Sequence, residues 1–136
     1  MDIILDTNAH SVFLLHFHLI FVTKYRKKVI TDEISYRLRD IFSYIAPTYK
    51  ITLLEWNHDK DHVHLLIKAH PKTTFSTFIN AYKSASSRLI KKEYPELKEK
   101  LYKEHFWSKS FCLMTVGNVS LDVIKKYIET QGECNG

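Results

Sequence analysis

Along the segment from Val12 to Thr23, every second residue is a large apolar one, which is the pattern of a β-strand with one buried face. The face expected to pack inward carries Phe13, Leu15, Phe17, Leu19 and Phe21. The opposite face carries His16 and His18. Three later segments are also predicted strands: Ile51 to Trp56, His62 to Ala69 and Ser110 to Val116. The second and third strands should form a hairpin around a turn at Asn57 to Lys60.

Apolar residues recur every three or four positions in three other segments, which predicts amphipathic helices. These helices are expected from Thr31 up to Pro47, from Thr74 to about Tyr94 and from Ser120 through Gln131. Thr31 can cap the first helix with its hydroxyl group, and Pro95 ends the second.

The predicted order is β-α-β-β-α-β followed by a helix, which is the split βαβ pattern of ferredoxin-like and RRM-like folds. We therefore expect an α+β fold in which two helices cover one face of an antiparallel sheet and an appended C-terminal helix carries Tyr127. In this topology the first and third strands are usually neighbours. The imidazoles of His16, His18, His62 and His64 should then share the exposed face of the sheet.

The chain has 136 residues, of which 45% are apolar, and this suits one compact domain that needs no disulfides. We assign residues 11–132 to this domain, residues 1–10 to a loose lead-in and residues 133–136 to a tail. The two cysteines show no ligand spacing, which fits a reducing compartment. The apolar run that begins at Val12 is too short to span a membrane and no basic segment precedes it, so we expect a soluble cytoplasmic protein without a membrane partner.

Basic residues outnumber acidic ones, with twenty Lys and Arg against fifteen Asp and Glu and a formal charge of +5. This balance favours a polyanionic partner. The basic residues gather in the run Lys24 to Lys28 and recur at near-helical spacing over Lys83 to Lys92. Many globular proteins carry such groups on a solvated face, so charge alone leaves both interpretations open.

Two pairs of residues have the spacing of a metal-assisted phosphodiester-cleaving site. His62 and His64 lie on one face of a predicted strand, roughly 7 Å apart, where two neutral imidazoles can bind one cation. Tyr127 and Gln131 lie one helical turn apart, so a nucleophile and a third ligand would share one face. Spacing does not single out this set, because His16-Phe17-His18 matches equally well and helical tyrosines more often pack than react.

A longer series of motifs distinguishes these possibilities. It comprises His18-Leu-Ile-Phe-Val-Thr-Lys-Tyr-Arg26, Asp61-His-Val-His-Leu-Leu-Ile67, Phe78-Ile-Asn-Ala-Tyr-Lys-Ser-Ala-Ser-Ser-Arg88, Phe106-Trp-Ser-Lys109, Thr115-Val-Gly117 and Tyr127-Ile-Glu-Thr-Gln131. In this order the motifs resemble those of the single-tyrosine HUH transposases, the TnpA-type enzymes that move small bacterial and archaeal insertion sequences as single-stranded DNA. The resemblance covers about residues 11 to 132.

The resemblance implies roles for individual residues. His62 and His64 would be the HUH pair, Tyr127 the nucleophile and Gln131 the third metal ligand, while His18 would have a supporting role on the sheet face. Two imidazoles and one amide oxygen suit Mg²⁺ or Mn²⁺. Attack by the tyrosine would leave a 5′-phosphotyrosine and a free 3′-hydroxyl, which allows excision and insertion of a single strand without ATP.

We expect basic side chains to contact the phosphates of this single-stranded DNA, with serine hydroxyls as further donors. The expected contacts are Lys24, Arg26, Lys83, Ser84, Ser87, Arg88 and Lys91. Tyr25 and Trp107 are candidates for stacking on bases, although Trp107 fits buried packing at least as well. The resemblance also implies DNA hairpins at the element ends and a homodimer. Gly117-Asn118 would then be either a hinge before the tyrosine helix or a simple loop.

Two other functions remain possible at this point. A ferredoxin-like module that only binds single-stranded nucleic acid would carry aromatic residues on its exposed sheet face, where this sequence is expected to present histidines. A related HUH nickase that acts on chromosomal palindromic repeats would share the same site. A replication-type nicking enzyme is disfavoured, because we expect no further domain.

Overall fold

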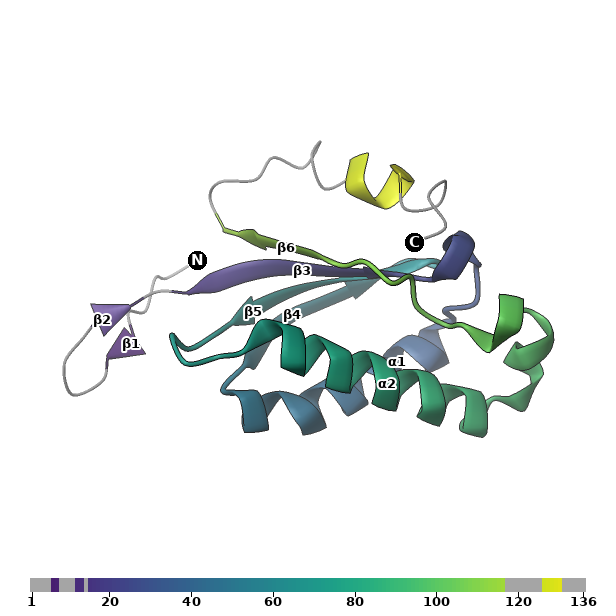
Figure 1. Ribbon diagram of the computed structural model, residues 1–136, viewed down its shortest axis with the longest axis horizontal. Coiled ribbons are helices and arrows are strands. Elements are labelled where there is room, and N and C mark those ends of the chain that lie inside the picture. Colours follow the sequence, from purple (N-terminus) through teal and green to yellow (C-terminus); the bar gives the residue numbers. More distant parts are fainter. Residues whose placement is uncertain (1–5, 8–11, 14, 117–125, 131–136) are drawn as a thin grey trace.

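The computed structural model describes residues 6–7, 12–13, 15–116 and 126–130, and it shows a four-stranded sheet with helices on one side (Figure 1). The strands are β1 (Asp6–Thr7), β2 (Val12–Phe13), β3 (His16–Val22), β4 (Thr52–His58), β5 (His62–Lys68) and β6 (Cys112–Thr115). The α-helices are α1 (Asp32–Ile45) and α2 (Phe75–Glu93), and residues 126–130 form a further helical segment. Short 3-10 helices are η1 (Lys24–Arg26), η2 (Ala46–Tyr49), η3 (Pro95–Glu99) and η4 (Tyr102–Glu104).

The main sheet has the strand order β4-β5-β3-β6, and every neighbouring pair is antiparallel. This order confirms the predicted ferredoxin-like α+β fold. It also confirms that the first and third predicted strands are neighbours, because β3 lies beside β5. In this register His62 lies opposite Val22 and His64 lies opposite Ile20.

The two faces of the sheet bury different layers. Val63, Leu65 and Ile67 alternate along β5 into the main core, where they meet the aromatic side chains that α1 and α2 supply. Figure 1 shows both helices on this side of the sheet and the helical segment 126–130 on the other. On that second side Tyr127 and Ile128 pack against a small cluster of Ile20, Val22 and Cys112. The predicted arrangement, two helices on one face and an appended helix with the tyrosine, is therefore present.

Local sequence signals explain where the long helices begin and end. The side chain of Thr31 accepts a hydrogen bond from the Ile34 amide at 3.2 Å, which makes it the predicted N-cap of α1. Pro47 stands in the 3-10 turn that follows this helix. The second helix ends one residue before Tyr94, and Pro95 then opens η3.

Three sequence predictions need correction. The single strand predicted over Val12 to Thr23 is divided, because β2 pairs with β1 in a separate two-stranded sheet while β3 pairs with β5 and β6. The lead-in of residues 1–10 is not wholly loose, since it contains β1. The turn predicted at Asn57 to Lys60 is shorter, because β4 extends through His58 and β5 begins at His62.

Several predictions fall outside the described residues. The N-terminal half of the last helix with Ser120, the Gly117-Asn118 break, Gln131 and the tail at 133–136 all lie there. Within the part of the chain that the structure describes, neither long helix has the length and apolar character needed to cross a bilayer.

Trp107 is part of the core rather than an exposed stacking platform. It is 7% exposed and packs against the rings of Phe21, Tyr82 and Phe106. Its indole Nε1 donates a 2.9 Å hydrogen bond to the buried hydroxyl of Ser86. This bond satisfies a donor that has no access to water, so it ties the segment after η4 to the middle of α2.

Removing the Ser86 hydroxyl should therefore destabilise the fold. In Ser86→Ala the Trp107 donor stays buried without its acceptor, and we expect a loss of about 1–3 kcal/mol in the free energy of unfolding, measured by urea denaturation. Ser43→Ala, on the exposed side of α1, is the control and should change stability by less than about 0.5 kcal/mol. Equal effects of the two substitutions on the free energy of unfolding would show that the hydrogen bond between Trp107 and Ser86 does not stabilise the fold.

Candidate active site

His62 and His64 project from the face of β5 that lies opposite the main core. Both are partly buried, and their cross-strand partners Val22 and Ile20 belong to the small cluster under Tyr127. Side chains of directly opposed residues in an antiparallel pair share a face. The register therefore places both imidazoles and the tyrosine helix on one side of the sheet, as the sequence predicted.

The carboxylate of Asp61 fixes the orientation of His62. Its Oδ1 lies 2.8 Å from His62 Nδ1, and its Oδ2 accepts a 2.9 Å bond from Arg26 Nε. A carboxylate can only accept, so the His62 proton is on Nδ1 and a neutral His62 presents Nε2 as a free acceptor. Burial acts to raise the pKa of Asp61, but hydrogen bonds and charge from His62 and Arg26 outweigh it and hold the pKa below its usual value.

His18 contacts His64 across the sheet. His18 Nδ1 lies 3.0 Å from His64 Nε2, and the two rings are 5.1 Å apart between centroids. Burial lowers the pKa of His64, and the neighbouring His18 and His62 lower it further, while Glu55 acts in the opposite direction. His64 is thus held in the neutral form that can bind a cation. The supporting position predicted for His18 agrees with this contact.

Tyr127 reaches this face from the helical segment 126–130. It packs beside Ile20, Val22 and Cys112, and its hydroxyl lies 3.3 Å from the hydroxyl of Ser110. Burial raises the pKa of Tyr127; the Ser110 bond acts against this rise and Cys112 adds to it. The side chain therefore stands as a protonated phenol at neutral pH. Gln131, its predicted companion, lies outside the described residues.

Lys83 holds the loop that carries Ser110. Its ammonium group donates to three consecutive carbonyls, those of Ser108, Lys109 and Ser110, at 2.8, 3.2 and 2.9 Å. It also lies over the rings of Phe21 and Phe111. Burial lowers the pKa of Lys83 to about 8. The sequence suggested a phosphate contact here, whereas in the structure these carbonyls occupy the ammonium donors.

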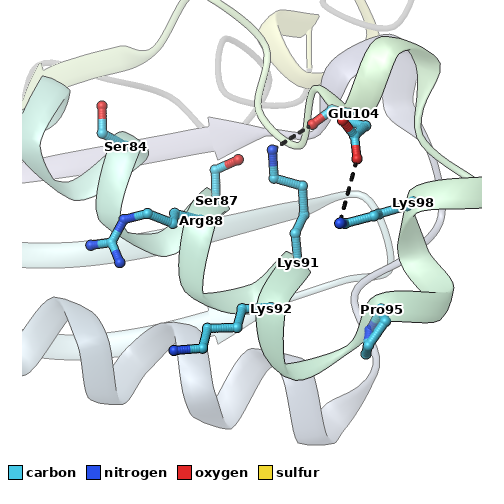
Figure 2. Close-up of a pocket in the computed structure, with 8 residues that line it drawn as sticks. All are labelled: Ser84, Ser87, Arg88, Lys91, Lys92, Pro95, Lys98 and Glu104. Atoms are coloured by element: carbon cyan, nitrogen blue, oxygen red, sulfur yellow. Dashed lines mark hydrogen bonds and ion pairs between the residues drawn. The ribbon is translucent and has the colours of Figure 1, made fainter.

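The other expected phosphate contacts fall into two groups. Lys24 is only 7% exposed, and Arg26 makes its ion pair with Asp61, the carboxylate that contacts His62. The remaining four line a hollow of about 570 Å³ along α2 (Figure 2). They are Ser84, Ser87, Arg88 and Lys91.

Asp61 and Ser110 contact the predicted site, but spacing arguments gave neither a role. An acidic residue directly before a histidine is a usable signal for Asp61, because it offers the Nδ1 partner that a ligating imidazole needs. Nothing in the sequence around Ser110 marks it. Its importance depends on the loop that brings it to Tyr127.

The described residues supply some, but not all, of the ligands that a divalent cation needs. His62 offers Nε2, and the neutral His64 would offer its Nε2 after exchanging the contact with His18. Within the described ranges, no group of three or more His, Cys, Asp or Glu side chains is placed to hold a metal, so the ligand set must be completed from elsewhere. An amide oxygen such as that of Gln131 is a suitable third donor for Mg²⁺ or Mn²⁺.

A ferredoxin-like antiparallel sheet with a His-x-His pair, and a helical tyrosine on the same face, defines the class of single-tyrosine HUH transposases. The family model described as "Transposase IS200 like" matches residues 11–131, and the chain belongs to this family. It is therefore a DNA transposase. The resemblance inferred from the sequence motifs is confirmed at this level.

Two similar proteins support this family assignment. The chain is 39% identical to the ISDra2 transposase TnpA of Deinococcus radiodurans over 120 residues, which cover 88% of this chain and 86% of the relative. It is 28% identical to the transposase for insertion sequence element IS200 of Salmonella typhimurium, covering 92% and 82% of the two chains. Both relatives are transposases, in agreement with the family.

Solved structures support the fold. A crystal structure described as a transposase from Deinococcus radiodurans R1 superposes with a TM-score of 0.84 at 35% identity, covering 93% of this chain and 97% of that one. A REP-associated tyrosine transposase bound to a REP hairpin gives a TM-score of 0.58 at 11% identity, covering 90% and 69%. The second likeness concerns the fold alone.

The Asp61 carboxylate should stabilise the fold in a pH-dependent way. Because its pKa is lower in the folded state, its contribution is fully present above the unfolded pKa of about 4 and is lost as the pH falls through the folded value. We expect Asp61→Asn to lower the free energy of unfolding by about 1–3 kcal/mol at pH 7, and by much less at pH 2.5.

Asp59→Asn, in the same hairpin loop but exposed, provides the matched control and should change stability little at either pH. Urea unfolding at several pH values measures both variants. A difference between wild type and Asp61→Asn that persists unchanged into acid would contradict the assignment of the ion pair.

Proposed function

We propose that this transposase cleaves and rejoins single-stranded DNA at insertion-sequence ends through a 5′-phosphotyrosine at Tyr127. The observation that carries this proposal is the shared sheet face: Tyr127 packs on Ile20 and Val22, which lie directly opposite His64 and His62. A nucleophile and two imidazoles on one surface are the parts that metal-assisted phosphodiester transfer requires.

His62 and His64 would hold a divalent cation, Mg²⁺ or Mn²⁺, with Gln131 as the third ligand. When bound, the cation withdraws charge from the scissile phosphate and orients it for in-line attack. Asp61 keeps His62 in the required tautomer through Nδ1, and Arg26 holds the carboxylate in place. Both residues are positioning groups for the imidazole rather than contacts to the phosphate.

Tyr127 would attack the phosphorus atom through its hydroxyl oxygen. The new bond joins this oxygen to phosphorus, the bond from phosphorus to the 3′-oxygen breaks, and the 3′-oxygen takes up a proton to become a free hydroxyl. Since the raised pKa of Tyr127 keeps it protonated beforehand, the phenol proton must leave during attack. The hydroxyl of Ser110 lies within hydrogen-bond distance of this phenol, at 3.3 Å.

The covalent intermediate would conserve the energy of the broken bond. A phosphotyrosyl diester can be attacked by the 3′-hydroxyl of another strand, which restores a DNA phosphodiester and frees Tyr127. Excision and insertion then need neither ATP nor net hydrolysis. This reversibility suits a transposase, whose product is a rejoined strand rather than a cut one.

The partners we propose are single-stranded DNA with hairpins at the element ends and a second copy of the chain. The hairpin is supported by a structure of the same fold, the REP-associated tyrosine transposase, which was solved bound to a REP hairpin. The family resemblance supports the homodimer. A related HUH nickase acting on chromosomal palindromic repeats is the weaker alternative, because the family model and the 39% identity to the ISDra2 transposase TnpA both favour a transposase.

A covalent adduct tests the nucleophile. Incubation of the protein with labelled single-stranded DNA that carries its own element's ends, in Mg²⁺ or Mn²⁺, should give an adduct that survives denaturation. Tyr127→Phe should abolish the adduct while DNA binding is kept. Tyr36→Phe is the control, since Tyr36 is 74% exposed on α1, and it should form the adduct normally. An adduct that persists in Tyr127→Phe assigns the chemistry to another residue.

Metal dependence tests the ligands. We expect His62→Ala and His64→Ala to reduce cleavage by at least about 100-fold, and Gln131→Ala to raise the Mn²⁺ concentration required for half-maximal cleavage without loss of DNA affinity. His16→Ala, on the same sheet face, is the matched control and should retain activity. Activity that depends on His16 but survives His62→Ala would move the site to the other histidine pair.

A further inference from the structure

Thr23, the residue directly after β3, is fully buried and links two segments beside the histidines. Its hydroxyl oxygen lies 2.8 Å from the carbonyl oxygen of Lys27 and 3.1 Å from that of Asp61. A hydroxyl carries one proton, so a single donor serves both carbonyls. Thr23 therefore joins the far end of the η1 turn to the residue directly before β5.

The backbone of Thr23 bonds to the same region. Its amide donates to the Asp61 carbonyl at 2.9 Å, and its own carbonyl accepts from the Arg26 amide at 3.0 Å. On its other side Thr23 forms an antiparallel β-bridge with Trp107. Arg26 and Asp61, whose side chains form the ion pair beside His62, are thus both bonded to one buried residue.

The turn that Thr23 closes has an unfavourable backbone conformation. Tyr25 and Arg26 have positive φ angles of 56° and 52°, in the left-handed region that few residues other than glycine adopt. Such a conformation persists only where the surrounding structure enforces it. Two of the enforcing bonds come from Thr23, whose carbonyl accepts from Arg26 and whose hydroxyl donates to Lys27. Loss of the hydroxyl would weaken the turn that brings Arg26 to Asp61.

The position of the Asp61 carboxylate decides which nitrogen of His62 is free. One carboxylate oxygen accepts from Arg26 Nε at 2.9 Å, and the other lies 2.8 Å from His62 Nδ1. A carboxylate that turned away from this geometry would release Nδ1, and the imidazole proton could then move to Nε2. A neutral imidazole protonated on Nε2 has no lone pair there for a metal ion.

We propose that Thr23 is a positioning residue for His62. Its buried hydroxyl fixes the Asp61 main chain and the η1 turn relative to each other, which holds Arg26 and the Asp61 carboxylate where they keep the His62 proton on Nδ1. Thr23 acts through these two residues rather than by contact with a cation. The inference rests on the proposed function in that His62 is taken as a metal ligand.

Two substitutions at Thr23 separate the hydroxyl from the space it fills. Thr23→Val keeps the branched shape and removes the hydroxyl, whereas Thr23→Ser keeps the hydroxyl and removes a methyl group. Neither carbonyl loses its last donor in Thr23→Val, because Asp61 retains the amide of residue 23 and Lys27 retains the amide of Val29. We therefore expect this variant to fold.

Thr73→Val is the matched control. The Thr73 hydroxyl donates to the carbonyl of Tyr49 at 3.0 Å, so the same substitution removes the same kind of bond. Thr73 lies between β5 and α2, and this loop is at the opposite end of β5 from His62. The control should leave the histidines unchanged.

The tautomer of His62 is the decisive measurement, and it needs neither metal nor DNA. Proton–nitrogen NMR spectra of the metal-free protein, isotope-labelled on histidine, distinguish protonated from unprotonated ring nitrogens at about pH 8, where an ordinary histidine is neutral. The His62 signals are those missing from His62→Ala. The wild type, Thr23→Ser and Thr73→Val should carry the proton on Nδ1. Thr23→Val should show a second population protonated on Nε2.

The metal requirement gives a second measurement. Thr23→Val should raise the Mn²⁺ concentration for half-maximal cleavage of single-stranded DNA by about fivefold, less than the roughly 10–100-fold typical of residues that contact a ligand directly. Saturating Mn²⁺ should restore the rate, because the ligands themselves are intact. Thr23→Ser and Thr73→Val should require the same Mn²⁺ concentration as the wild type.

Equal His62 spectra in Thr23→Val and Thr73→Val would overturn the proposal. A Thr23→Ser variant with the spectrum of Thr23→Val would also overturn it, since the effect would then come from packing of the methyl group. So would a Thr23→Val variant that circular dichroism shows to be unfolded, because Thr23 would then have a general role in stability.

The covalent adduct at Tyr127 separates this inference from the proposed function. If the adduct forms in the wild type while the two valine variants have equal His62 spectra, only the role of Thr23 fails. If Thr23→Val alone changes the tautomer while the wild type forms no adduct, Thr23 does position His62 and the proposed function fails.

Discussion

The pairing of β3 with β5 is the constraint on which the site depends. Because side chains alternate across a strand, the same register that sends Val63, Leu65 and Ile67 into the core turns His62 and His64 outward. A slip of one residue would bury both imidazoles and expose the apolar set, so the free energy of the core also protects the position of the histidines. The fold and the chemistry of this face are therefore fixed by one set of backbone hydrogen bonds.

A second layer of polar contacts turns this framework into a defined geometry. The chain leaves β3 through η1, where Tyr25 and Arg26 adopt positive φ angles of 56° and 52°. Arg26 then lies at the Asp61 carboxylate, which holds His62. Lys83 positions the Ser110 loop in a similar way, because its ammonium group donates a hydrogen bond to the Ser110 carbonyl. Both cations are partly buried and bind groups of the protein itself, Arg26 the Asp61 carboxylate and Lys83 three backbone carbonyls.

The sequence predicted the fold well because alternation and helical periodicity report directly on burial. It placed every strand of the main sheet and both long helices, and the His62 and His64 face followed from topology. The strand prediction failed where one continuous apolar pattern belongs to two different sheets. The run from Val12 contains both β2, which pairs with β1, and β3, which pairs with β5. Charge was the poorest guide, since Arg26 and Lys83 look like surface cations in the sequence. Their partners, Asp61 and the 108–110 carbonyls, come close only after the chain folds.

The packing of Tyr127 on the sheet opposes movement of the helical segment that carries it. The helical segment 126–130 covers Ile20, Val22 and Cys112, which are 0, 1 and 5% exposed. If this segment moved away to carry the tyrosine elsewhere, it would expose apolar surface, at a cost of about 1.5–3 kcal/mol for each large side chain uncovered. These apolar contacts therefore oppose any movement of the segment away from the sheet. Any structure that takes its place must bring an apolar surface of its own.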